Sequence, residues 1–228
     1  MDLGAVKEAP VRELARGAVA AARNARGLIE DAELLSGAGR QARSYSLAGL
    51  AVEEVGKAGI LATLAAMPVK VRARAPVGRM LEWHQMKLVT GHLIAAVPLG
   101  VPGVATRFVT TPVSEVAEML DKAQAFTQDA DRLKQRGLYV DVDRSGRIRE
   151  PAEVTAADVR EQLNRARQAA SATTALLDPS APLCLANPGA ADVEFSRALV
   201  SAFGKTGLAR SPGAAADVLR NTAAKLRG

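Results

Sequence analysis

The stretch LARGAVAAARNARGLIEDAELL, residues 14–35, decides the fold class. Its apolar residues recur at alternating steps of four and three, at Leu14, Ala18, Ala21, Ala25, Leu28, Ala32 and Leu35. This spacing keeps them on one face of an α-helix, so the stretch predicts a long helix that packs along its length. Ser36, Gly37 and Gly39 follow and end the helix.

Two more stretches repeat this pattern. One runs over residues 47–65 and stops before Pro68, and the next runs over 77–95, between Pro76 and Pro98. Short connections between such helices favour antiparallel neighbours in a bundle. The remaining sequence predicts, in order, a loop at 99–111, a helix at 112–136, a small hairpin at 138–149, a helix at 155–177, a linker at 178–189 and two short helices at 190–203 and 213–227.

The composition agrees with an all-α protein. Apolar residues make up 48% of the 228 residues, enough for a packed core, whereas aromatic residues make up only 3% and alanine is abundant. We therefore expect an up-and-down helical bundle with a small hairpin insertion over residues 1–178. Residues 179–228 are expected to form a linker and a C-terminal helical extension that packs on the bundle.

The charge balance suits an anionic partner. Lys and Arg number 30 against 24 Asp and Glu, a formal charge of +6. Residues 68–79 contain four basic side chains and no acid, at Lys70, Arg72, Arg74 and Arg79. If the partner is RNA, the first three are candidate RNA-binding residues. The alternative is a solvated basic face.

Several classes of protein lack support in this sequence. The only cysteine is Cys184, no secretory signal is present, and the most apolar stretch, 93–105, is too short and too rich in Pro and Gly to span a membrane. A cytoplasmic protein without a membrane partner is expected. The two histidines lie eight residues apart, without the spacing or the cysteine cluster of a metal site, and no P-loop, dinucleotide fingerprint or nucleophile elbow occurs. No metal and no cofactor are therefore expected.

Two of the apolar faces contain a residue of an unexpected kind. Glu54 occupies a core-facing position of the second helix, and His84 occupies one of the third. A buried carboxylate is costly unless it is paired. Lys57 and Lys87 lie three residues further along their respective helices and are candidate partners.

Other polar residues accompany these. Glu53 lies four residues before Lys57, and Asn24 and Asp31 lie at the edge of the apolar stripe of the first helix. Three neighbouring helices are thus predicted to aim polar side chains at a common interior or cleft, which favours a functional site. The alternatives are a buried network that only fixes helix register and, for His84, a satisfied core histidine. His92 is expected to have a structural or surface role.

Three pieces of the sequence, in order, resemble the AbiV family of abortive-infection proteins, in the HEPN superfamily. The first is RNARGLIEDAELLSGAGRQARSYSLAGLAVEEVGKAGIL at 23–61, which ends in the Glu-Glu-x-Gly-Lys element at 53–57. The second is WHQMK at 83–87, similar to a His-x-x-Lys helix, and the third is GLYVD at 137–141. The resemblance covers about residues 14–177.

The resemblance implies a helical bundle of a kind that commonly dimerises. It also implies a site, because many HEPN proteins are metal-independent ribonucleases with an Arg-x(4–6)-His motif, which Arg79 and His84 fit. In such a site His84 would be acid or base, Arg79 or Lys87 would hold the phosphate, and Glu54 would orient His84. The residue after the Arg is often polar in active members, and here it is Met80.

Two readings of function follow and stay open. The first is a toxin-like endoribonuclease of antiphage defence that arrests translation by cutting RNA, and the Arg79–His84 spacing favours it. The second is a non-catalytic HEPN dimer that blocks translation by binding RNA or a protein, and Met80 favours it. A helical adaptor or nucleotide-binding protein is a third class. The expected partners are RNA, a second copy of the chain and a phage-encoded activator. Two copies would bring two His84 side chains to one cleft, with Gly56, Gly59 and Gly91 allowing close approach of helices.

Overall fold

The computed structural model describes residues 3–67, 69–73, 77–82, 84–96, 113–139, 141–142, 145–149 and 154–177. Its elements are α1 (Leu3–Glu8), α2 (Val11–Gly37), α3 (Gln41–Ala66), α4 (Val69–Arg72), α5 (Val77–Glu82), α6 (His84–Ala96), α8 (Val113–Leu138), β1 (Asp141–Val142), β2 (Ile148–Arg149) and α9 (Ala156–Leu177). The expected all-α class is confirmed, because helices account for nearly all of these elements. The expected loop at 99–111 and the expected linker and helices after residue 177 lie outside the described residues.

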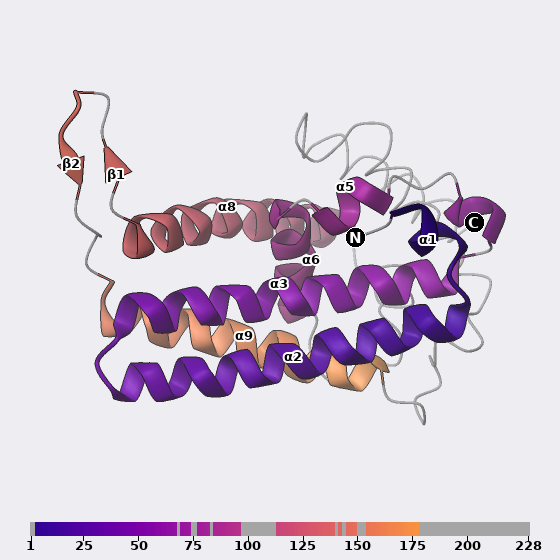
Figure 1. Ribbon diagram of the computed structural model, residues 1–228, viewed down its shortest axis with the longest axis horizontal. Helices are drawn as coiled ribbons and strands as arrows, with labels where there is room; N and C mark the ends of the chain where they lie inside the picture. Colours follow the sequence, from indigo (N-terminus) through magenta and orange to yellow (C-terminus); the bar gives the residue numbers. More distant parts are fainter. Residues whose placement is uncertain are drawn as a thin grey trace.

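Helix α3 is the central helix of the bundle. It contacts α2, α6, α8 and α9, and α2 and α3 lie side by side along their length (Figure 1). A connection of three residues joins α2 to α3, and in it Gly39 has a φ of +74°, a conformation that glycine adopts without strain. So short a connection makes the two helices antiparallel neighbours, as their sequence predicts.

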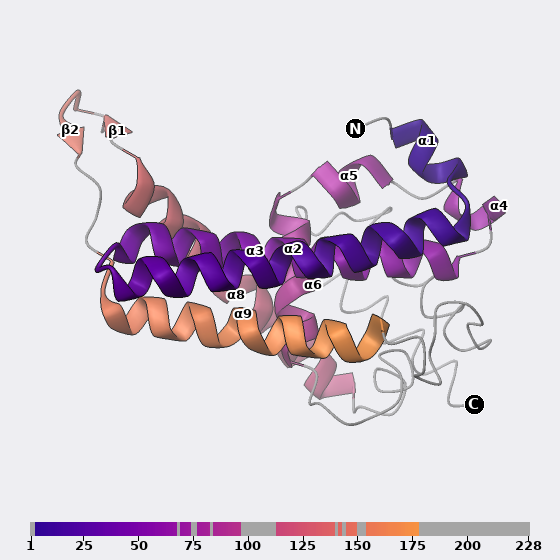
Figure 2. The same ribbon diagram turned by 60° about the horizontal axis from the view of Figure 1, so that its bottom comes forward.

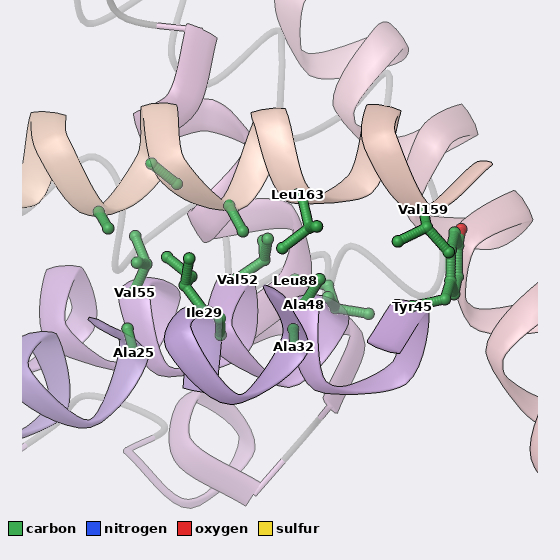
Figure 3. Close-up of a cluster of buried hydrophobic side chains, with 14 of the residues drawn as sticks. Ala25, Ile29, Ala32, Tyr45, Ala48, Val52, Val55, Leu88, Val159 and Leu163 are labelled. Atoms are coloured by element: carbon green, nitrogen blue, oxygen red, sulfur yellow. The ribbon is translucent and has the colours of Figure 1, made fainter. Parts of the chain in front are cut away.

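The largest part of the core lies where α2, α3 and α9 meet. Figure 3 shows side chains from each helix pointing into a common interior, with Ile29 from α2, Val52 from α3 and Leu163 from α9 among them. Leu88 of α6 joins them. Because α3 is covered on several sides, its buried residues do not form one stripe, and both Val52 and its neighbour Ala51 are fully buried.

Helices α3 and α6 approach each other unusually closely, through two glycines. A Cβ atom at Gly56 would lie 1.8 Å from the carbonyl oxygen of Lys87, and one at Gly91 would lie 2.2 Å from that of Val52. A Cβ at Gly59 would lie 2.6 Å from Ile94. These glycines therefore let helix backbones within one chain approach closely, as the sequence predicts.

The helix expected at 77–95 corresponds to α5 and α6, and residue 83 between them lies outside the described residues. Helix α6 crosses the long helices steeply (Figure 2), where Gly91 and Gly56 allow contact with α3. Helix α5 instead buries Val77 and Leu81 in a second apolar cluster, with Leu14 and Leu64. Met86 of α6 joins the same cluster, so the two helices share part of their packing.

The local predictions for the last third of the described chain are confirmed. Helix α8 leads into a hairpin in which Val142 pairs with Ile148, and Gly146 in its turn has a φ of +78°. The hairpin projects from one end of the bundle (Figure 1). Helix α9 begins at the predicted capping pair: the amide of Asp158 donates to the Thr155 hydroxyl at 3.2 Å, and the Thr155 amide donates to the Asp158 carboxylate at 2.9 Å.

None of the described helices combines the length and the apolar character needed to cross a bilayer.

Candidate functional site

Five ionisable side chains from three helices, with His84 at their centre, lie close together. Glu53 comes from α3, His84 and Lys87 from α6, and Asp131 and Lys134 from α8. We call these five residues the His84 cluster. Helix α3 lies centrally and contacts both α6 and α8, and the Gly56 and Gly91 contacts hold α6 close to it.

Glu53 is the most buried member of the cluster, with 8% of its side chain exposed. One carboxylate oxygen lies 2.6 Å from His84 Nδ1 and 3.9 Å from Lys87 Nζ, and the other lies 3.3 Å from Lys134 Nζ. An unpaired carboxylate at this depth would be strongly unfavourable, and these three nitrogen groups offset that cost. Glu53 thereby fixes the position of the imidazole ring.

The other ring nitrogen of His84 lies between an acceptor and a donor. Asp131 Oδ1 lies 2.8 Å from His84 Nε2, and Lys134 Nζ lies 2.9 Å from the same atom. Lys134 Nζ and Asp131 Oδ1 lie 3.4 Å apart. The three atoms form a compact triangle, on a side of the ring where Asp131 keeps 27% of its side chain exposed.

The two contacts of Nε2 require different positions of one proton. When Nε2 carries a proton it donates to Asp131, and when it does not it accepts from the Lys134 ammonium. In both cases Nδ1 donates to Glu53, so Nε2 is the atom that gains and loses the proton. His84 therefore has one nitrogen, Nδ1, with a fixed hydrogen bond and one nitrogen, Nε2, at which a proton can be exchanged.

The electrostatics favour a charged imidazole. The hydrogen bond to Glu53 raises the pKa of His84 above its ordinary value, against the opposing effects of burial and of Lys134. Burial acts to raise the pKa of Asp131, but the hydrogen bond and charge of His84, with Lys134, lower it below its ordinary value. His84 therefore remains protonated to higher pH than a free histidine, while Asp131 remains a carboxylate.

This geometry does not make a metal-binding group. Among the described residues, no set of three or more His, Cys, Asp or Glu side chains is placed to hold one metal ion. Glu53 and Asp131 engage opposite nitrogens of the same ring, so their oxygens do not converge on a single point with it.

The prediction of which glutamate contacts His84 was wrong by one residue. Glu54 pairs with Lys57 at 2.7 Å, and its carboxylate has no contact with His84 among those seen in the described chain, whereas its neighbour Glu53 does. A single apolar stripe could not identify the correct glutamate, because α3 is packed on several sides. Asn24 and Asp31 on α2 are both exposed, so the prediction that they belong to the polar interior is also wrong.

The predicted RNA-binding residues fare differently from one another. Arg72 is 1% exposed and donates to the backbone carbonyls of Lys7, Leu64 and Ala9. Burial lowers its pKa from the ordinary value. It holds α4 to the N-terminal segment, so its predicted contact with RNA is wrong. Lys70 is exposed, while Arg74 and the side chain of Arg79 lie outside the described residues.

Asp131 and Lys134 were missed by sequence reasoning. They lie on the helix predicted at 112–136, but nothing local distinguishes them from a surface pair three residues apart. One signal was present: Thr127, Ala130, Lys134 and Gly137 follow the three-and-four spacing of a buried face. A lysine in that stripe could have been recognised as a partner for the buried glutamate.

The second histidine does not take part. His92 is 4% exposed, packs edge-on against Phe126 at 4.5 Å between ring centroids, and has no hydrogen-bond partner on either nitrogen within the described part of the chain. Burial, with the nearby charge of Arg165, lowers its pKa to about 3. It stays neutral near physiological pH, which leaves His84 as the histidine able to exchange protons there.

The model of the HEPN_AbiV family, described as AbiV, matches residues 13–171, well over half of the chain. No curated protein matches, and no solved structure matches. The matched segment includes all five residues of the His84 cluster.

Proposed function

Because this chain belongs to the AbiV family of HEPN proteins, an abortive-infection family, we propose that it is a metal-independent endoribonuclease of antiphage defence. It acts in the cytoplasm and arrests translation by cutting RNA, and a phage-encoded protein raises this activity during infection. The observation that carries the proposal is His84, whose Nδ1 is anchored on buried Glu53 while Nε2 faces the partly exposed side of the cluster.

The chemistry uses the 2′-hydroxyl of RNA as an internal nucleophile. His84 Nε2, in its neutral form, takes the proton of that hydroxyl while the 2′ oxygen bonds to phosphorus. The bond from phosphorus to the 5′ oxygen breaks, and that oxygen takes up a proton. The products are a 2′,3′-cyclic phosphate and a 5′-hydroxyl. Lys134 and Lys87 supply the positive charge that stabilises the phosphorane.

The leaving 5′ oxygen needs a second proton-transfer group. In a homodimer a second His84, already protonated because of its raised pKa, supplies it. Within one chain the Lys134 ammonium, 2.9 Å from Nε2, is the nearest alternative. Glu54, which was predicted to orient His84, pairs with Lys57 instead. We propose the homodimer, with an interface that leaves Nε2 open.

A second function is favoured by a specific observation. Both nitrogens of His84 are already engaged, and a closed network of this kind suits a residue that fixes helix register. Met80 after Arg79 points the same way. In that case the protein is a non-catalytic dimer that blocks translation by occupying RNA or a protein.

The test uses purified protein, a defined RNA and EDTA. Wild type should cut the RNA and leave 2′,3′-cyclic phosphate ends, and His84→Asn should not. Glu54→Gln is the matched control, since it removes one charge of a neighbouring pair without touching His84. Circular dichroism establishes that each variant is folded. Intact RNA with arrested protein synthesis, in cells expressing either wild type or His84→Asn, would establish occupancy instead.

A further inference from the structure

Asp131 occupies a place in the His84 cluster that suits a different anion. Its Oδ1 atom lies 2.8 Å from His84 Nε2 and 3.4 Å from Lys134 Nζ. An imidazole and an ammonium group that both contact one oxygen form a suitable binding position for a phosphate oxygen. We propose that His84 Nε2 and Lys134 Nζ form a binding position for a phosphodiester oxygen of RNA, and that Asp131 fills this position until RNA displaces it.

The two carboxylates of the cluster differ in depth, and this difference identifies the one that leaves. Glu53 has 8% of its side chain exposed and contacts three of the other four members. Asp131 has 27% exposed and contacts two of the other four members, His84 and Lys134. Water can replace those contacts at the partly exposed Asp131, and its short side chain needs one rotation to leave. Glu53 therefore stays in place, and Asp131 is the carboxylate that RNA displaces.

The charges of the cluster make the exchange balanced. Glu53 and Asp131 carry two negative charges against the two positive charges of Lys87 and Lys134, and His84 adds a third when it is protonated. In either protonation state of His84, departure of Asp131 raises the net charge of the cluster by one, beside Nε2. A phosphodiester also carries one negative charge, so its arrival restores the balance. A neutral ligand would leave a desolvated positive charge behind.

The exchange has a consequence for proton transfer. With Asp131 in place, Nε2 is covered by a carboxylate that holds its proton and lowers its reactivity. Displacement frees Nε2 and leaves Lys134 to hold the entering phosphate. The protein therefore does not cleave RNA that binds too weakly to displace Asp131. This inference rests on the proposed function for its meaning in the cell, but the binding position can be tested without any cleavage.

The test follows the imidazole signals by NMR while inorganic phosphate replaces chloride at constant ionic strength. The chain has two histidines, and buried His92 is an internal reference that should not respond. Asp131→Asn should bind phosphate roughly tenfold more tightly than wild type, with a saturable shift of His84. Asp129→Asn is the matched control, because it makes the same change in charge on the same helix at an exposed residue that pairs with Arg132.

Two further arms complete the experiment. Adding Lys134→Gln to Asp131→Asn should remove the tighter binding. A short 2′-O-methyl RNA, which has no free 2′-hydroxyl and cannot be cut, should show the same order of affinities as phosphate. Equal affinities for Asp131→Asn, Asp129→Asn and wild type would overturn the inference, and so would binding of phosphate without binding of the RNA. Tighter RNA binding by Asp131→Asn with no cleavage by wild type would keep the binding position and remove the ribonuclease.

Discussion

Replacement of Gly56 by alanine should open the contact between α3 and α6 and disturb the His84 cluster. The new Cβ would lie 1.8 Å from the Lys87 carbonyl oxygen and 2.6 Å from its carbonyl carbon. Ordinary carbon–oxygen contacts are about 3.3 Å. The two helices must therefore separate by about 1.5 Å, since the obstructing atoms are backbone and cannot rotate away.

The expected loss of stability comes from this separation. Overpacking of a core commonly costs about 1–3 kcal/mol, and a clash with backbone places Gly56→Ala near the upper figure. Alanine also favours helix over glycine by about 1 kcal/mol, which offsets part of the loss. We expect the free energy of unfolding to fall by about 2 kcal/mol. The 2.6 Å contact between Glu53 and His84 Nδ1 should lengthen beyond hydrogen-bonding range, because Glu53 lies one turn before Gly56.

The assay is urea unfolding monitored by circular dichroism, together with the pKa of His84 from NMR. Gly27→Ala is the control, because Gly27 lies within α2 and a Cβ there would meet no atom within 4 Å. That variant should gain about 0.5–1 kcal/mol. Equal stability of the two variants would refute the close-packing argument. A destabilised Gly56→Ala with an unchanged pKa at His84 would refute the link between helix spacing and the cluster.

Three other predictions concern single side chains. Glu53→Gln should lower the pKa of His84, measured by NMR, and reduce RNA cleavage about 100-fold. Glu54→Gln should leave the pKa of His84 unchanged, and equal effects of the two substitutions would contradict the geometry. Because the pKa of His92 is lowered in the folded chain, the unfolded chain binds a proton first as pH falls below 6.5. The unfolding free energy of wild type should therefore fall by about 1.6 kcal/mol between pH 6.5 and 5, a loss that His92→Leu avoids. Parallel pH profiles of the two proteins from urea unfolding would count against this. Arg72→Met should lower the unfolding free energy by about 3 kcal/mol, since buried carbonyls lose their donor; an unchanged urea midpoint would show that Arg72 is dispensable.

Elements governed by nearby residues could be predicted from the sequence. The turn after α2 at Gly39, the turn at Gly146 and the start of α9 at Thr155 and Asp158 each depend on a backbone conformation or a hydrogen bond between close neighbours. The apolar spacing of α2 and α3 likewise depends only on the helical period. These features required no knowledge of what packs against them.

The composition of the candidate site depended on tertiary contacts. His84 could be singled out because an ionisable residue stood in an apolar stripe, but the period of a helix does not say which neighbour covers which side. Glu53 and Lys134 are 81 residues apart in sequence, and His84 and Lys134 are 50 apart. The sequence by itself determined where the long helices α2, α3, α8 and α9 lie and that polar groups enter the core. Only the close packing of α6 on α3, with α8 beside them, decided that Glu53 rather than Glu54 holds the histidine and that Asp131 and Lys134 complete its surroundings.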